Sequence, residues 1–167
     1  MAHYDLLVIG TGPAGQKAAV QAAKLGKKVG IIERKEVVGG VSTNTGTIPS
    51  KSLREAVLYL AGFRQRTLYG AEYRLKKTIT IEDLAFRANH VIKNEIEIVQ
   101  NQMARNGIDL IHGEASFIDP HRITIQRAGT TTEHRAHVIV IAVGTEPARP
   151  ADIPFDEKTI IDTDGLL

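Results

Sequence analysis

Three glycines lie where a short apolar run gives way to a helical pattern. Gly10, Gly12 and Gly15 follow residues 6–9, which are all aliphatic, and precede alanines and a leucine at helical spacing. This spacing allows a tight strand-to-helix turn, close approach of the backbone to a pyrophosphate, and close helix–sheet packing. The N-terminus of the helix would direct free N–H groups at the phosphates, which is favourable for an anion. The turn therefore predicts a dinucleotide site.

An acidic residue ends the βαβ unit that contains this turn. We expect a strand over 4–9, a helix over 13–25 and a second parallel strand over 28–33, which ends at Glu33. A carboxylate at that position can accept hydrogen bonds from both hydroxyls of an adenosine ribose, and it would repel a 2′-phosphate. The motif thus favours FAD or NAD over NADP. The alternative interpretation is a solvated charge at a strand end.

Composition narrows the class of protein. The chain has 167 residues, of which 43% are hydrophobic and 24% charged, which is typical of one globular, water-soluble domain. The net charge is +2 without a dense basic stripe, so nucleic acid is not an expected partner. Without any cysteine the chain has no disulfide, thiolate metal site or cysteine nucleophile. The start does not resemble a signal peptide and no apolar run is long enough to cross a membrane, so we expect a cytoplasmic protein.

A glycine-rich segment follows the second strand. Residues 37–51 are predicted to form a loop that leads into a helix through Leu60, with Pro49 and Ser50 at its start. Lys51 would then lie on the first turn, where a cation is electrostatically unfavourable, and this suggests a role for its ammonium group.

The remaining elements are read from local patterns. Residues 63–77 are predicted to form a polar connection, and residues 80–106 one long core-facing helix. Residues 108–111 are predicted to form a third parallel strand, and residues 123–133 a hairpin. Residues 138–142 are mostly β-branched and are expected to form a strand that is buried on both faces.

The segment from Gly39 to Lys51 resembles the redox loop of the flavoprotein disulfide reductase family. That family reads Gly-Gly-x-Cys-x-x-x-Gly-Cys-Ile-Pro-Ser-Lys, and its two cysteines form the active disulfide. This chain has Ser42 and Thr47 at the cysteine positions, so the resemblance implies that dithiol chemistry is lost.

Residues 46–51 together with 53–57 resemble the transhydrogenase branch of that family more closely. Members of this branch, of the Si-specific type, exchange hydride between NADH and NADP⁺ through FAD alone. The resemblance implies an α/β fold, namely a Rossmann-like FAD-binding domain with a parallel sheet, helices and a small β-meander. It also implies FAD as cofactor, with NADH and NADP⁺ as substrates and a homodimer for the full-length family enzyme.

The resemblance also assigns roles to individual residues. Lys51 would lie near flavin N5 and O4, Thr47 would face the flavin ring, the backbone around Ala115 would bond the adenine edge, and the segment Ala142 to Gly144 would pass beside the pyrophosphate. No residue is assigned to proton transfer or to a metal. The expected cofactor-binding residues are Gly10, Gly12, Pro13, Ala14, Gly15, Glu33, Arg34, Gly39, Gly40, Val41, Ser42, Gly46, Thr47, Lys51, Ala115, Ala142 and Gly144.

We expect residues 1–148 to form the FAD-binding domain, in its N-terminal part, and residues 149–167 to cross toward a nicotinamide-nucleotide domain. The chain would then cover only the first part of the family architecture and would lack transhydrogenase activity by itself. Two alternatives stay open: a binding module for FAD or another adenine dinucleotide without catalysis, and a dihydrolipoamide dehydrogenase-like protein without its redox cysteines.

Overall fold

The structure is a computed structural model that describes residues 2–62 and 78–166. The polar connection predicted over 63–77 lies outside the described residues. The chain divides into two compact units: Met1–Val41 with Glu95–Thr145, and Ser42–Asn94 with Glu146–Leu167. The described elements are β1 (Ala2–Ile9), α1 (Pro13–Lys24), β2 (Val29–Glu33), α2 (Gly40–Asn44), α3 (Thr47–Leu60), α5 (Ile81–Arg105), β3 (Asp109–His112), β4 (Glu114–Asp119), β5 (Arg122–Arg127), β6 (Thr130–Ile141) and α6 (Thr163–Leu166).

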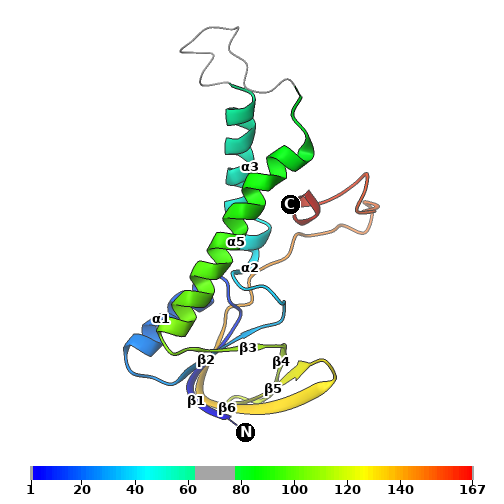
Figure 1. The fold of residues 1–167 in the computed structure, drawn as a ribbon. Coiled ribbons are helices and arrows are strands. Elements are labelled where there is room, and N and C mark those ends of the chain that lie inside the picture. The colour runs from blue at the N-terminus through cyan, green and yellow to red at the C-terminus, as the bar shows by residue number, and fades with distance from the viewer. Residues whose placement is uncertain (1, 63–77, 167) are drawn as a thin grey trace. The chain divides into compact units, whose positions relative to one another are not determined.

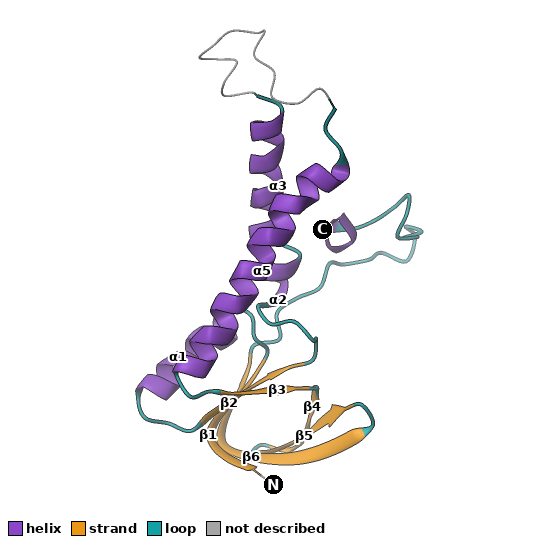
Figure 2. Ribbon diagram, viewed as in Figure 1, coloured by secondary structure: helices purple, strands orange, loops and turns teal. Residues whose placement is uncertain are grey.

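All six described strands belong to one sheet in the first unit, in the order β3-β2-β1-β6-β5-β4 (Figures 1 and 2). Strands β3, β2, β1 and β6 are parallel neighbours, whereas β6, β5 and β4 pair antiparallel as a meander. The predicted Rossmann-like α/β fold with a parallel sheet and a small meander is confirmed.

The two ends of this sheet are joined directly. Only Gly113 separates β3 from β4, although these strands stand at opposite ends of the sheet order, so the sheet must curl back on itself. Gly113 has a φ of +149°, and a Cβ there would lie 2.6 Å from Cγ2 of Ile125 on β5. Its N–H donates to the carbonyl of Glu33 over 2.8 Å. The end of β2 is thereby fixed beside the meander.

Two hydrophobic clusters hold the first unit together. One joins β1 and β2 to α1 and to the C-terminal part of α5, through residues such as Val8, Val20 and Met103. The other joins Leu7 and Ile32 to Ile123 of the meander. Helices therefore cover one face of the parallel strands, and the curled meander covers the other. The core-facing assignment is confirmed for the C-terminal part of α5, where Met103 is 2% exposed, and is wrong for its first residue, Ile81, which is 65% exposed.

Strand β6 differs from the prediction. It forms one long strand that includes the predicted segment 138–142 almost entirely, but Val138 and Ile141 are 55% and 64% exposed. The expectation that this segment is buried on both faces is therefore wrong. Pairing with β5 ends at Arg135, so among the described strands the rest of β6 pairs with β1 alone. Its β-branched composition favours a strand whether or not its faces are covered.

Helix α3 also begins earlier than predicted. Gly46 is its N-cap, Ser50 donates the first i→i−4 bond to the Gly46 carbonyl over 3.1 Å, and Pro49 lies at the third helical position. Proline is tolerated there because the first N–H groups of a helix have no intrahelical acceptor. Lys51 consequently lies in the second turn rather than the first, and the short helix α2 occupies part of the predicted loop.

The start of α5 agrees with the prediction. The Thr80 N–H donates to Oδ2 of Asp83 over 2.9 Å, and the Asp83 N–H donates back to Oγ1 of Thr80 over 3.4 Å. This reciprocal pair satisfies two N–H groups at the helix N-terminus. None of the described helices has the length and apolarity needed to cross a membrane.

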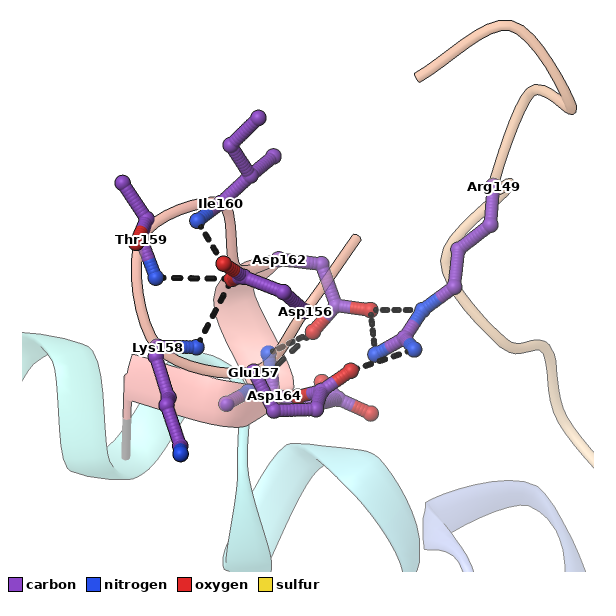
Figure 3. Close-up of polar contacts among 9 residues, drawn as sticks. Arg149, Asp156, Glu157, Lys158, Thr159, Ile160, Asp162 and Asp164 are labelled. Carbon is purple, nitrogen blue, oxygen red and sulfur yellow. Dashed lines mark hydrogen bonds and ion pairs between the residues drawn. The ribbon is translucent and has the colours of Figure 1, made fainter. Parts of the chain in front are cut away.

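In the second unit, residues 146–162 are held by side chains of their own (Figure 3). Arg149 donates to Asp162 over 2.8 Å and pairs with Glu157, and Asp162 accepts two N–H groups at the start of α6. Asp156 accepts the N–H groups of residues 158–160, and these bonds hold the pKa of its carboxyl well below the usual range. The assignment of 149–167 as a crossover stays a prediction.

The glycine turn yields a test of the fold. A Cβ on Gly15 would lie 2.0 Å from the carbonyl oxygen of Gly10, whereas a Cβ on Gly12 would meet nothing within 4 Å. Gly15→Ala should lower the free energy of unfolding by about 3 kcal/mol, because backbone must move to admit the methyl group. Gly12→Ala, at a φ of −65°, should change it by less than about 0.5 kcal/mol. Urea unfolding of both variants checks this, and equal losses would contradict the packing described.

Tyr4 gives a pH-dependent test. Its ring is 4% exposed, and burial, followed by a hydrogen bond and charge interaction with Asp109, raises its pKa from 10.0 to about 12. The folded state favours the neutral phenol, so this contribution to stability is complete below pH 10 and is lost as the pH rises to about 12. Urea unfolding between pH 9 and 12 should show a steeper fall for the parent chain than for Tyr4→Phe. Parallel curves would contradict the assignment.

Candidate functional site

The turn between β1 and α1 brings three backbone segments into direct contact. Gly10 has a φ of +107°, and a Cβ there would lie 2.3 Å from the carbonyl oxygen of Ala142. Ala142 follows β6, and its N–H donates to the Ile9 carbonyl over 2.8 Å. Side chains at Gly10 and Gly15 are thus excluded by packing, while the space over Gly12 is open. The tight packing predicted from the sequence is confirmed at Gly10 and Gly15, whereas close approach of a ligand at Gly12 stays a prediction.

The N-terminus of α1 presents backbone donors at this open space. Gly12 is the N-cap without a side-chain capping bond, Pro13 is the first helical residue, and the first turn carries no acidic side chain. The first intrahelical bond runs from Gln16 to Gly12 over 3.0 Å, so the N–H groups of Ala14 and Gly15 precede the helical ladder. Those N–H groups and the helix dipole favour an anion at this position.

Glu33 is buried at the end of β2, with 8% of its surface exposed. Its Oε2 accepts the N–H of Thr11 over 3.2 Å and also the Thr11 hydroxyl, while its Oε1 accepts the N–H of Lys35 over 3.0 Å. These donors offset the loss of hydration of a buried carboxylate. Glu33 is therefore not the solvated strand-end charge of the alternative interpretation.

Thr11 is not among the residues predicted for the site. It is fully buried between two of the predicted glycines, and its hydroxyl also accepts the Gly39 N–H over 3.1 Å. The sequence signal for its role is the presence of a hydroxyl-bearing residue between two glycines of the turn. The glycine spacing predicts backbone freedom and gives no information about the side chain between the glycines.

The predicted residues Gly39 and Gly40 lie against the glycine turn. They have φ values of +107° and +63°, and a Cβ on Gly40 would lie 2.9 Å from Cα of Gly12. The segment after β2 therefore reaches the N-terminus of α1 through this backbone contact and through the hydrogen bond from the Gly39 N–H to the Thr11 hydroxyl. Val41, the next predicted residue, is 40% exposed.

A cavity of about 480 Å³ lies next to the end of β2. Predicted residue Arg34 lines it, whereas predicted residue Ala115 on β4 is half-buried and packs in the second cluster. Glu36 and Arg127 form an ion pair of 3.0 Å across its lining, but both side chains are largely exposed, so the pair contributes at most about 1 kcal/mol. The lining residues are Arg34, Lys35, Glu36, Gly113, Glu114, Gln126, Arg127 and Ala128.

The other predicted residues of the glycine-rich segment belong to the second unit. Ser42 lies in α2, Gly46 caps α3, Thr47 is its exposed first residue, and Lys51 is exposed in its second turn. Gly144, which belongs to the first unit, has a φ of +72° with open space around it. The flavin contacts assigned to these residues stay predictions. Within the described part of the chain, no cluster of three or more histidines and carboxylates has the arrangement of a metal site.

The fold and this turn define a dinucleotide-binding domain of the Rossmann type. The sequence pattern of the pyridine nucleotide-disulphide oxidoreductase family matches residues 4–166. The chain belongs to that family.

Individual relatives agree with this assignment. The chain is 55% identical over its whole length to a soluble pyridine nucleotide transhydrogenase of Mycobacterium tuberculosis and covers 36% of that protein. It is 41% identical to the soluble pyridine nucleotide transhydrogenase of Colwellia psychrerythraea, with 98% of this chain and 35% of the relative covered. A solved structure of the flavoprotein disulfide reductase RclA from Escherichia coli, a Cu(II) complex, superposes with a TM-score of 0.79 at 28% identity, over 99% of this chain and 34% of that one. The chain spans about a third of the length of these proteins.

Proposed function

We propose that this chain is the FAD-binding part of a flavoprotein oxidoreductase of the transhydrogenase type. The observation that carries the proposal is the open space over Gly12, at the N-terminus of α1, on a turn whose Thr11 contacts a buried strand-end carboxylate. Transhydrogenase relatives at 55% identity support the choice of reaction, and the similarity to RclA, a flavoprotein disulfide reductase, supports the choice of a flavin cofactor.

The residues at the turn fit a pyrophosphate. The N–H groups of Ala14 and Gly15 precede the helical ladder, and the first turn of α1 has no acidic side chain that would repel an anion. A glycine at position 12 leaves room for phosphate oxygens to approach the backbone. The backbone around the phosphate position is formed by Gly10, Pro13 and the segment after β6, none of which contributes charge.

The adenosine end is assigned to Glu33 and the cavity beside it. A carboxylate has about four acceptor positions, and three donors from Thr11 and Lys35 already use three of them. About one position is left for a ribose hydroxyl, so we infer one strong bond rather than the two expected from the sequence. The neighbouring cavity of about 480 Å³, lined in part by Arg34, is large enough for an adenine ring.

The flavin end is assigned to Ser42, Thr47 and Lys51 on the resemblance of residues 39–51 alone. When bound, FAD supplies hydride acceptance and donation. The Lys51 ammonium would favour negative charge on a reduced flavin, and Thr47 would offer a hydroxyl where disulfide reductases have a thiol. Since Ser42 and Thr47 stand at the two cysteine positions of the redox loop, we infer that electrons leave to a nucleotide and not to a dithiol.

The names of the relatives support pyridine nucleotides as substrates. We infer NADH and NADP⁺ as the pair, in a longer protein that is a cytoplasmic homodimer. The second candidate function is a binding module for any adenine dinucleotide, which the position of Glu33 and the cavity would serve equally well.

Gly12→Ala tests the proposal without disturbing the fold. Its methyl group would occupy the space assigned to the pyrophosphate, so the affinity of the purified chain for FAD should fall about tenfold or more. Binding is measured by quenching of flavin fluorescence and by flavin absorbance that co-elutes with the protein on gel filtration.

Gly26→Ala is the matched control. Gly26 follows the C-terminal end of α1 with a φ of +75° and open space around it, so alanine there should lower stability by about 1 kcal/mol without changing FAD affinity. If Gly12→Ala binds FAD as tightly as the parent chain, the pyrophosphate does not lie at this turn. If the parent chain binds NAD and not FAD, the binding-module function replaces the flavoprotein function.

A further inference from the structure

We propose that Thr11 is a positioning residue that fixes the Glu33 carboxylate for the ribose of a bound adenine dinucleotide. This inference rests on the proposed function and adds a specificity-determining side chain to it. Thr11 stands between Gly10 and Gly12, where a residue without a hydroxyl would satisfy the backbone requirements of the turn equally well.

Each polar atom of Thr11 has a defined partner. Its N–H and hydroxyl both donate to Oε2 of Glu33, and its carbonyl accepts Nε2 of Gln16 over 2.8 Å. Its hydroxyl oxygen accepts the N–H of Gly39 over 3.1 Å. Because the Gly39 N–H can only donate, the Thr11 hydroxyl proton is directed to Glu33. The side chain is 0% exposed, so water does not compete for these bonds.

These bonds restrict the carboxylate from both sides. Thr11 holds Oε2 and the Lys35 N–H holds Oε1 over 3.0 Å, so rotation of the carboxylate about its terminal torsion would break contacts at both oxygens. The remaining acceptor position is therefore fixed before a ligand arrives. Fixing it in advance avoids an ordering cost at the moment of binding.

The same hydroxyl links the carboxylate to the loop that crosses the turn. Gly39 donates to Thr11, and the neighbouring Gly40 packs on Gly12. Removing the hydroxyl would leave the Gly39 N–H without this acceptor and free Oε2 from one of its two donors. The hydrogen bond from the Thr11 N–H to Glu33 Oε2 would remain, so one of the two hydrogen bonds between these residues is kept.

Thr11→Val removes the hydroxyl at nearly constant shape, and Thr11→Ser keeps it. The probes are ADP and 2′-deoxyADP, whose dissociation constants for the purified chain are measured by calorimetry. The parent chain and Thr11→Ser should prefer ADP by about tenfold, as expected for one hydrogen bond to a charged acceptor. Thr11→Val should reduce this preference to about twofold, and Glu33→Gln should reduce it similarly.

A purely structural Thr11 would give a different pattern. If Thr11→Val weakens both ligands equally and keeps the tenfold preference, or tightens ADP because the hydroxyl had competed with the ribose, the inference is overturned. If circular dichroism shows that Thr11→Val does not fold, Thr11→Ala provides the same comparison. A parent chain that binds FAD but shows no ADP preference overturns this inference alone, whereas one that binds neither ADP nor FAD overturns the proposed function with it.

Discussion

The buried carboxylate of Glu33 is the constraint on which the arrangement of this site depends. An ionised group removed from water is costly unless donors replace its hydration. Here the donors come from the glycine turn and from the residue two positions beyond the strand, and Thr11 extends the network to the loop at Gly39. The end of β2, the start of α1 and the following loop must therefore adopt one relative position. The carboxylate that we propose as a ribose acceptor is in this way also a determinant of the fold.

The glycines of the site differ in the space around them. Gly10, Gly15 and Gly40 bring backbones so close that a methyl group would overlap carbonyl or Cα atoms, which makes them packing residues. Gly12 has no such neighbour, and the space beside it is where we propose that a pyrophosphate binds. A sequence motif treats all of them alike, although the space around Gly12 differs from that around the other three.

Local patterns predicted most of this fold, because its elements follow strong local signals. The glycine turn, Pro13 at the helix start, Glu33 at the strand end and Thr80 before α5 each act within a few residues. The exposure of Val138 and Ile141 could not be predicted, since it depends on which strands lie next to β6. The hydrogen bonds of Thr11 could not be predicted either, because its partners Glu33 and Gly39 lie 22 and 28 positions away in the sequence. The cavity is formed by loops from β2 and the meander, whose proximity follows from the curl at Gly113.

We propose above all that the first unit recognises the adenosine pyrophosphate half of FAD. Titration of the purified chain with FAD and with FMN tests it most directly, because FMN carries the same isoalloxazine ring without the adenosine half. We predict that FAD binds at least about tenfold more tightly than FMN and that ADP displaces it. Equal affinities for FAD and FMN, or FAD binding that ADP does not displace, would contradict the account.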